Sequence, residues 1–430
     1  MKNIYRRLEK VNFIILCSAI FLFRLPPLNL LSVDSPILST HGISRIAILL
    51  ITLLNIILLY KKLLNFRLDK KLTIFIALYF LSLSASVLNS ININAFFSFY
   101  KDIIIGLLIF INANILINTE EKVYFIIKAI TLTVIFNLLF QYLIYFHPDL
   151  TSAIRYLFYS KYWKLVEINY SRGRFFSDIY DAALIPLLFF SIKKKGNSLS
   201  FTSIIITCFI ILFTFLSNFR GHVIILLISM FVFQFTYFNK YKKASFLVII
   251  FLFVTIYVGN LISVNFVKYS IIDRFIFPEQ QDNLSILGRI DNWNESIRMG
   301  LSSPLTGIGL GNFYDNLPSV NKPHGFVADW KYKLADISAV DPHNIFFSIF
   351  AETGFLGLFS FCLLLIYFML NDIKSLKYDG NLNHILLIES FWLFFLYSLF
   401  DPAYTIPYLA TFWLLRLMII KSFPAIYDKK

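Results

Sequence analysis

The stretch HNIFFSIFAETGFLGLFSFCLLLIYFML, residues 343–370, decides the fold of this chain. As a helix it is long enough to cross the hydrocarbon core of a bilayer, and Glu352 is its one carboxylate. Similar apolar runs recur along the whole sequence, in which 58% of residues are hydrophobic and 15% are charged. This composition is more apolar than that of soluble domains, and it predicts an all-α polytopic membrane protein.

Runs of transmembrane length predict about twelve membrane-spanning helices. They lie near residues 11–28, 43–60, 72–88, 97–117, 123–146, 176–192, 201–217, 222–238, 244–262, 343–370, 384–399 and 405–420. The run at 97–117 is the weakest, because it contains Lys101 and Asp102. Because the sequence has no internal repeat, residues 1–430 are predicted to form a single transmembrane domain.

Lysine and arginine decide the predicted orientation, because they concentrate in cytoplasmic loops. The basic turns at 61–71, 193–195, 240–243 and 421–430 all fall on one side if the N-terminus is cytoplasmic. The C-terminus is then cytoplasmic too, and the net charge of +14 is mainly a topology signal. Nucleic acid binding is not expected, since no soluble domain carries a basic face.

Two longer segments face outward in this topology, at about 147–175 and 263–342, and we expect them to form a helical cap. In the second segment Ile290, Trp293 and Ile297 have helical spacing and predict an apolar stripe. Arg289 lies on the neighbouring face of the same predicted helix.

A glycine-rich turn follows Pro304, which is expected to end that helix. It contains Gly307, Gly309 and Gly311, and such spacing requires unusual backbone angles or close approach. A phosphate-binding loop is disfavoured, because no Lys-Ser/Thr pair follows. A tight turn that shapes the wall of a pocket is the preferred interpretation.

Four arginines are predicted on the outward side: Arg172, Arg174, Arg220 and Arg289. The planar guanidinium fork suits phosphate oxygens, although a single arginine can equally extend to lipid headgroups. As a group they favour a diphosphate site. Three further cations lie near predicted outer helix ends and are candidates to add positive charge to the same site: Arg24, Arg45 and Lys101.

His343 follows Pro342 at the predicted outer start of a helix. An imidazole can take a proton from a hydroxyl near neutral pH, and the alternative is a histidine bonded to the backbone at a helix start. Glu352 lies on the opposite face of a regular helix, so it is structural, or it orients His343 if the helix kinks near Gly354. His384 lies at the inner end of its predicted span, and no histidine has metal-site spacing.

These segments together resemble the superfamily of O-antigen ligases and polymerases. The resemblance is carried by Arg289, Trp293, the run from Pro304 to Phe313, His343-Asn344, and the run from Glu352 to Gly357. It covers about residues 170–360 and includes the turn that ends in Arg220.

The resemblance implies a GT-C-like, metal-independent, inverting glycosyltransferase of the bacterial inner membrane with a periplasmic active site and no cofactor. It would use undecaprenyl-diphosphate-linked glycans as donor and acceptor, alongside a chain-length regulator and other envelope assembly proteins. His343 would be the general base, with Arg220 and Arg289 also catalytic. The four outward arginines would hold the diphosphate, and a further set would shape the pocket: Trp293, Gly307, Gly309, Gly311, Asn344 and Glu352.

Three functions remain open from the sequence. An O-antigen polymerase is preferred, from the Gly-x-Gly-x-Gly-Asn-Phe and Pro-His-Asn motifs. A ligase that transfers the polymer to lipid A core is the near alternative. A transporter is less favoured, because the predicted spans lack paired carboxylates at the middle of the bilayer.

Overall fold

The computed structural model describes the helical bundle and the turns at one end of it. The described residues are 2–25, 28, 39–58, 69–146, 182–188, 201–216, 220–238, 253–254, 257–258, 261, 280–317, 342–378, 382–400 and 406–422. They form helices joined by turns, with no extended strand among them. The predicted all-α class is therefore confirmed for this part of the chain.

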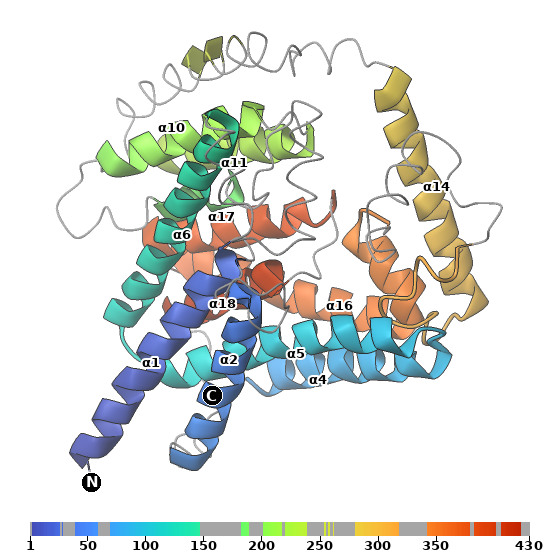
Figure 1. Cartoon of the computed structure of the whole chain (residues 1–430), viewed down its shortest axis with the longest axis horizontal. Helices are drawn as coiled ribbons and strands as arrows, with labels where there is room; N and C mark the ends of the chain where they lie inside the picture. Colours follow the sequence, from blue (N-terminus) through green and yellow to red (C-terminus); the bar gives the residue numbers. More distant parts are fainter. Residues whose placement is uncertain are drawn as a thin grey trace.

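The helices differ in length and are numbered as in Figure 1. They are α1 (Lys2–Arg24), α2 (Thr40–Leu58), α4 (Lys70–Ala85), η1 (Ser86–Asn89), α5 (Ile93–Leu116), α6 (Glu120–Phe146), η3 (Ala182–Leu184), α9 (Ile185–Leu188), α10 (Phe201–Leu216), α11 (Arg220–Phe238), α14 (Gln280–Ser302), α16 (Ile345–Tyr378), α17 (Leu382–Tyr397) and α18 (Ile406–Ser422).

Five helices in the described part are long and apolar enough to cross a membrane: α2, α4, α5, α6 and α16. The chain is thus an integral membrane protein. The total of about twelve spans, the orientation and the cap remain predictions. The proposed cap segment 147–175 lies outside the described residues, and only 280–317 and 342 of the segment 263–342 are described.

Long helices pack in pairs around one apolar core: α1 with α2, α4 with α16, and α5 with α18 (Figure 1). The last pair approaches closely at Gly106, where an added Cβ would lie 3.1 Å from Leu409 Cβ and from Trp413 Cδ1. Small residues permit such close packing between membrane helices, where lipid supplies little hydrophobic force for association.

An amide chain joins α1, α2 and α5 within this core. Asn12 Nδ2 donates to Asn55 Oδ1 at 3.0 Å, and Asn55 Nδ2 donates to Asn112 Oδ1 at 2.8 Å. Asn112 Nδ2 then donates to Thr52 Oγ1 at 2.7 Å. Hydrogen bonds between buried polar side chains hold membrane helices in register, because the alternative is an unsatisfied amide in hydrocarbon.

The span with the weakest sequence signal is stabilised by an ion pair. Helix α5 includes both Lys101 and Asp102, and Asp102 Oδ2 lies 3.2 Å from Arg45 Nη2 of α2. The carboxylate is therefore compensated by the neighbouring helix, which explains how a charged residue is accommodated in an apolar segment.

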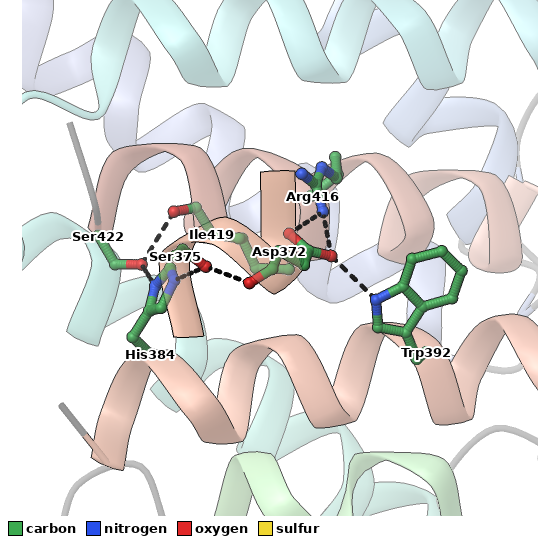
Figure 2. Close-up of polar contacts among 7 residues, drawn as sticks. All are labelled: Asp372, Ser375, His384, Trp392, Arg416, Ile419 and Ser422. Carbon is green, nitrogen blue, oxygen red and sulfur yellow. Dashed lines mark hydrogen bonds and ion pairs between the residues drawn. The ribbon is translucent and has the colours of Figure 1, made fainter. Parts of the chain in front are cut away.

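Asp372 connects α16, α17 and α18 near the end of the bundle where α16 ends (Figure 2). Its two carboxylate oxygens lie 2.7 and 2.8 Å from Arg416 Nη1, and Trp392 Nε1 donates to Oδ2 at 2.9 Å. The Arg416 guanidinium also lies over the Phe368 ring, 4.2 Å from its centroid. Both charges are almost fully buried, so the pair persists only because these partners compensate it.

His384 completes the same cluster (Figure 2). Its ring nitrogens lie 2.8 Å from Ser422 Oγ and 2.9 Å from Ser375 Oγ. Ser375 donates to the Asp372 carbonyl at 2.8 Å, so the histidine and the ion pair form one network. Neither Asp372 nor Arg416 belongs to a sequence motif that predicted a role for it.

Replacing Asp372 with Ala should leave the buried guanidinium of Arg416 without its carboxylate, at a cost of about 3–5 kcal/mol. The measurement is the thermal unfolding midpoint of the detergent-solubilised protein. Glu295→Ala is the matched control, because the Glu295–Arg298 pair is partly exposed and should contribute less than about 1 kcal/mol. Equal loss in both variants would contradict the buried role of Asp372.

Candidate functional site

Helix α16 is broken at Gly354, where φ is 65° and ψ is −163°. In an unbroken helix the carbonyls of Ala351 and Glu352 would accept from amides four residues later. Here they accept from Ile308 and Gly309 of the glycine-rich turn, and each nitrogen-to-oxygen distance is 3.0 Å.

The amides beyond the break are satisfied by the same turn. Phe355 donates to the Pro304 carbonyl at 2.7 Å, and Leu356 donates to the Leu305 carbonyl at 3.2 Å. Two backbone hydrogen bonds therefore run from amides of the helix to carbonyls of the turn, and two run from amides of the turn to carbonyls of the helix. The glycine-rich segment is locked to α16 through backbone atoms.

Close approach explains why glycine stands at the break and in the turn. A Cβ on Gly354 would lie 2.5 Å from the Leu305 carbonyl carbon, and a Cβ on Gly307 would lie 2.3 Å from the Glu352 carbonyl carbon. Both residues also have positive φ, which other L-residues rarely adopt.

The other side of the turn packs against the connection between α4 and α5. A Cβ on Gly309 would lie 2.7 Å from Ser90 Cα, and one on Gly311 would lie 2.5 Å from Phe99 Cδ2. The three glycines thus form a turn wedged between two parts of the bundle. Their role in shaping a substrate pocket remains a prediction.

Two asparagines fasten the turn to that connection. Asn312 Oδ1 accepts from the Asn92 amide at 2.6 Å, and its Nδ2 donates to Ser90 Oγ at 2.7 Å. Asn89 Nδ2 donates to Ser303 Oγ at 2.7 Å. Asn312 stood in the motif without an assigned role, whereas nothing in the sequence singled out Asn89.

Trp293 links α14 to the segment that carries His343. Its indole Nε1 donates to the Pro342 carbonyl at 2.8 Å. Its ring stacks on Phe347 of α16, with centroids 5.3 Å apart and planes 15° apart. One side chain of α14 therefore contacts the chain on both sides of His343.

The apolar stripe on α14 is divided between two surroundings. Trp293 stacks on α16, whereas Ile290 and Ile297 are exposed. The face packed on α16 carries Ser296, Met299 and Gly300, and glycine stands at position 300 because the Phe350 ring of α16 lies close to it.

His343 lies just before α16 and has a φ of 52°, in the left-handed region. The helix begins at Ile345, so the prediction that His343 starts it is corrected by two residues. Asn344 caps the helix, since its Oδ1 accepts from the Phe346 amide at 2.9 Å. The side chain of His343 is half-buried.

The same segment is held by the end of α17. The Ile345 amide donates to the Ser398 carbonyl at 3.0 Å, and Asn344 Nδ2 donates to the Leu399 carbonyl at 3.3 Å. His343 is thus preceded by a contact with α14 and followed by contacts with α17.

Of the four predicted arginines, the structure describes Arg289 and the backbone of Arg220. Arg289 is half-buried and lies one turn before Trp293, on the side of α14 that faces the bundle. Arg220 begins α11, but its side chain lies outside the described residues. Arg172 and Arg174 lie outside them altogether.

The start of α11 lies near the His343 segment at the level of the backbone. A Cβ on Gly221 would lie 3.5 Å from Phe400 Cβ, and Phe400 follows the Leu399 carbonyl that Asn344 contacts. The backbone of Arg220 is therefore placed on the same side of the bundle as His343.

Glu352 is buried, and its backbone carbonyl takes part in the exchange with Gly309. Helix α16 is kinked at Gly354, which is the condition under which Glu352 would orient His343. The structural and orienting roles of Glu352, and its assignment to the pocket, remain predictions.

Two cations considered for the site are engaged elsewhere. Arg24 is buried, and it donates to Thr133 Oγ1 at 3.0 Å and to Thr411 Oγ1 at 2.8 Å. Arg45 is paired with Asp102. Both arginines therefore tie helices together, and we do not include them in the site.

The architecture is that of a polytopic helical membrane protein in which a glycine-rich turn is locked into a broken helix. Residues 203–362 match the family model described as O-antigen ligase. This match covers less than half of the chain and bears out the predicted resemblance to the O-antigen ligase and polymerase superfamily over those residues. It spans α10 to the middle of α16 and includes Arg220, Arg289, Trp293 and His343. No curated protein sequence matches the chain.

Replacing Gly354 with Ala should destabilise the protein by more than about 1 kcal/mol, because the new Cβ would meet the Leu305 backbone at a positive φ. Gly288→Ala is the control: nothing lies within 4 Å of its Cβ position in α14, and alanine favours a helix by about 1 kcal/mol. The unfolding midpoint in detergent is the measurement. A Gly354→Ala protein as stable as wild type would contradict the exchange of backbone bonds.

Proposed function

We propose that this protein is an O-antigen polymerase that acts at the periplasmic face of the bacterial inner membrane. It would transfer a glycan from undecaprenyl diphosphate to a hydroxyl of a second lipid-linked repeat unit. The family match supports the superfamily. The hydrogen bond from Trp293 to the Pro342 carbonyl supports the site, since it joins the helix of Arg289 to the segment of His343.

The chemistry requires two functions on opposite sides of the anomeric carbon. The acceptor oxygen attacks this carbon, the bond from carbon to the diphosphate oxygen breaks, and the hydroxyl proton passes to the His343 imidazole. Such general-base assistance is typically worth about 10²–10⁴ in rate. A single displacement of this kind inverts the configuration at the carbon.

The leaving diphosphate gains negative charge as the bond breaks. Arg289, with Arg220 and either Arg172 or Arg174, would stabilise this charge through guanidinium forks, without a metal ion. We therefore propose a metal-independent mechanism and no cofactor. A chain-length regulator and other envelope assembly proteins are proposed partners.

A ligase that transfers finished polymer to lipid A core is the second candidate, since the matching family model bears that description. A strain that lacks this chain separates the two on a gel of surface polysaccharide. A core that carries a single repeat unit would support the polymerase. A bare core, with polymer retained on the carrier lipid, would support the ligase and contradict the polymerase. Unchanged polysaccharide would contradict both.

His343→Asn should abolish polymer formation while the protein remains in the membrane. Asparagine is chosen because it tolerates the positive φ of this position better than alanine does, so the loss reports on the missing imidazole. The chain-length ladder on a gel, together with the amount of membrane-bound protein, is the measurement. Retained long chains would exclude His343 as the base.

Arg289→Lys should strongly reduce polymer formation, because a point charge cannot reproduce the two-pronged contact of the guanidinium. Arg298→Lys is the matched control on the same helix, since Arg298 is exposed and paired with Glu295. The ladders of the two variants are compared at equal protein levels. Equal ladders would argue against diphosphate binding by Arg289.

A further inference from the structure

Helix α14 has three distinct faces, and among the described residues one of them packs on the protein. Ser296, Met299 and Gly300 form this packed face and are buried. A Cβ on Gly300 would lie 2.4 Å from Phe350 Cε1, so the contact with α16 is close. Figure 1 shows α14 steeply inclined to α4, α5 and α16.

The second face of α14 is exposed and mainly apolar, with Asn294 as its polar member. It carries Ile290, Ile297 and Leu301, which lie on one side of the helix at the spacing of successive turns. Leu287 continues the row at the beginning of the helix. Packing against the described part of the chain does not explain large aliphatic side chains in such a row, because they are exposed there.

The third face of α14 is polar. Asp291 and Arg298 are exposed, and the Arg298 guanidinium lies 2.7 Å from Glu295 Oε2. A helix with separate apolar and charged faces is typical of segments that lie in the plane of a membrane interface.

Beyond the end of α14, exposed apolar side chains lead from this face to a candidate membrane-spanning helix. Leu301 lies one turn before Leu305, which is 66% exposed. The Leu305 carbonyl accepts from Leu356 of α16, and both Leu356 and Phe359 are exposed on that candidate span. The surface of α14 is therefore an extension of the lipid-facing surface of α16.

The neighbouring connection between α4 and α5 adds to this surface. Leu88 and Ile91 are 80% and 71% exposed, and Asn89 between them donates to Ser303 just after α14. Apolar side chains from three parts of the chain thus surround one corner of the bundle. Several large exposed apolar side chains in one region mark an interaction surface rather than ordinary solvent exposure.

We propose that α14 is an in-plane membrane anchor whose apolar face, with Ile290, Ile297 and Leu301, is immersed in the lipid at one bilayer interface. The occupant is the acyl-chain layer, because the face is continuous with a span that must itself contact acyl chains. The polar face with Asp291 then lies toward water.

This placement sets the height of the candidate site. Arg289 and Trp293 are on the protein-facing side of α14, so an immersed α14 holds them at the level of the lipid headgroups. A diphosphate attached to a lipid lies at that level. This consequence rests on the proposed function, whereas the lipid contact of α14 does not.

Spin labels on the full-length protein test the placement. Cys17, Cys208 and Cys362 are first replaced by alanine, and single cysteines are then introduced as Ile297→Cys, Leu301→Cys and, as the water-side control, Asp291→Cys. Each labelled protein is placed in nanodiscs of phosphatidylethanolamine and phosphatidylglycerol. Collisions with oxygen, which concentrates in lipid, are compared with collisions with a water-soluble nickel chelate.

The ratio of oxygen to nickel collisions should be several-fold higher at positions 297 and 301 than at position 291. Nickel access at 297 and 301 equal to that at 291 would show that this face meets water, and would overturn the proposal. Labels at 297 and 301 that neither reagent reaches would show a covering protein, such as a second copy, and would also overturn it. Catalytic activity does not enter this measurement, so an inactive His343→Asn protein gives the same reading.

Discussion

The exchange of backbone hydrogen bonds at Gly354 is the constraint on which the described site depends. A broken helix leaves carbonyls and amides without their usual partners, and each such group costs several kcal/mol in a membrane if it stays unsatisfied. The glycine-rich turn supplies those partners, and α16 supplies the partners of the turn. Neither element satisfies its backbone without the other, so they must form together.

The exchange has consequences at both ends of the turn. On the N-terminal side of the turn, α14 ends at Ser302. Because the turn is bonded to α16, the position of this end of α14 is set by α16. On the C-terminal side of the turn, Asn312 fastens the chain to the connection between α4 and α5. Trp293 then extends the constraint to Pro342, and the residues around His343 are positioned by α14 on one side and α17 on the other. His343 gains a defined position although it lies outside any helix.

The all-α class and the resemblance to the superfamily could be predicted from the sequence, because apolar length and unusual glycine spacing are local signals. The exchange of backbone hydrogen bonds could not be predicted, since the run from Glu352 to Gly357 is compatible with a regular helix unless its distant partner is known. The direction of the apolar stripe on α14 could not be predicted either, because in a membrane protein helical periodicity does not distinguish a face that meets lipid from one that meets protein. The pair of Asp372 and Arg416 was missed because the two residues lie on separate helices with no shared motif.

The cluster around Asp372 and the region around His343 differ in how accessible their polar groups are. At Asp372 the carboxylate is bonded to the guanidinium and the indole, and the ion pair is closed to solvent. A buried charge that is already compensated in this way is poorly suited to bind a ligand. Arg289 and His343 are only half-buried, and they lie where a turn, a helix start and an inclined helix meet. A group that must bind a diphosphate or accept a proton has to remain accessible, and this accessibility supports the proposed placement of the chemistry at the end where the helix is broken.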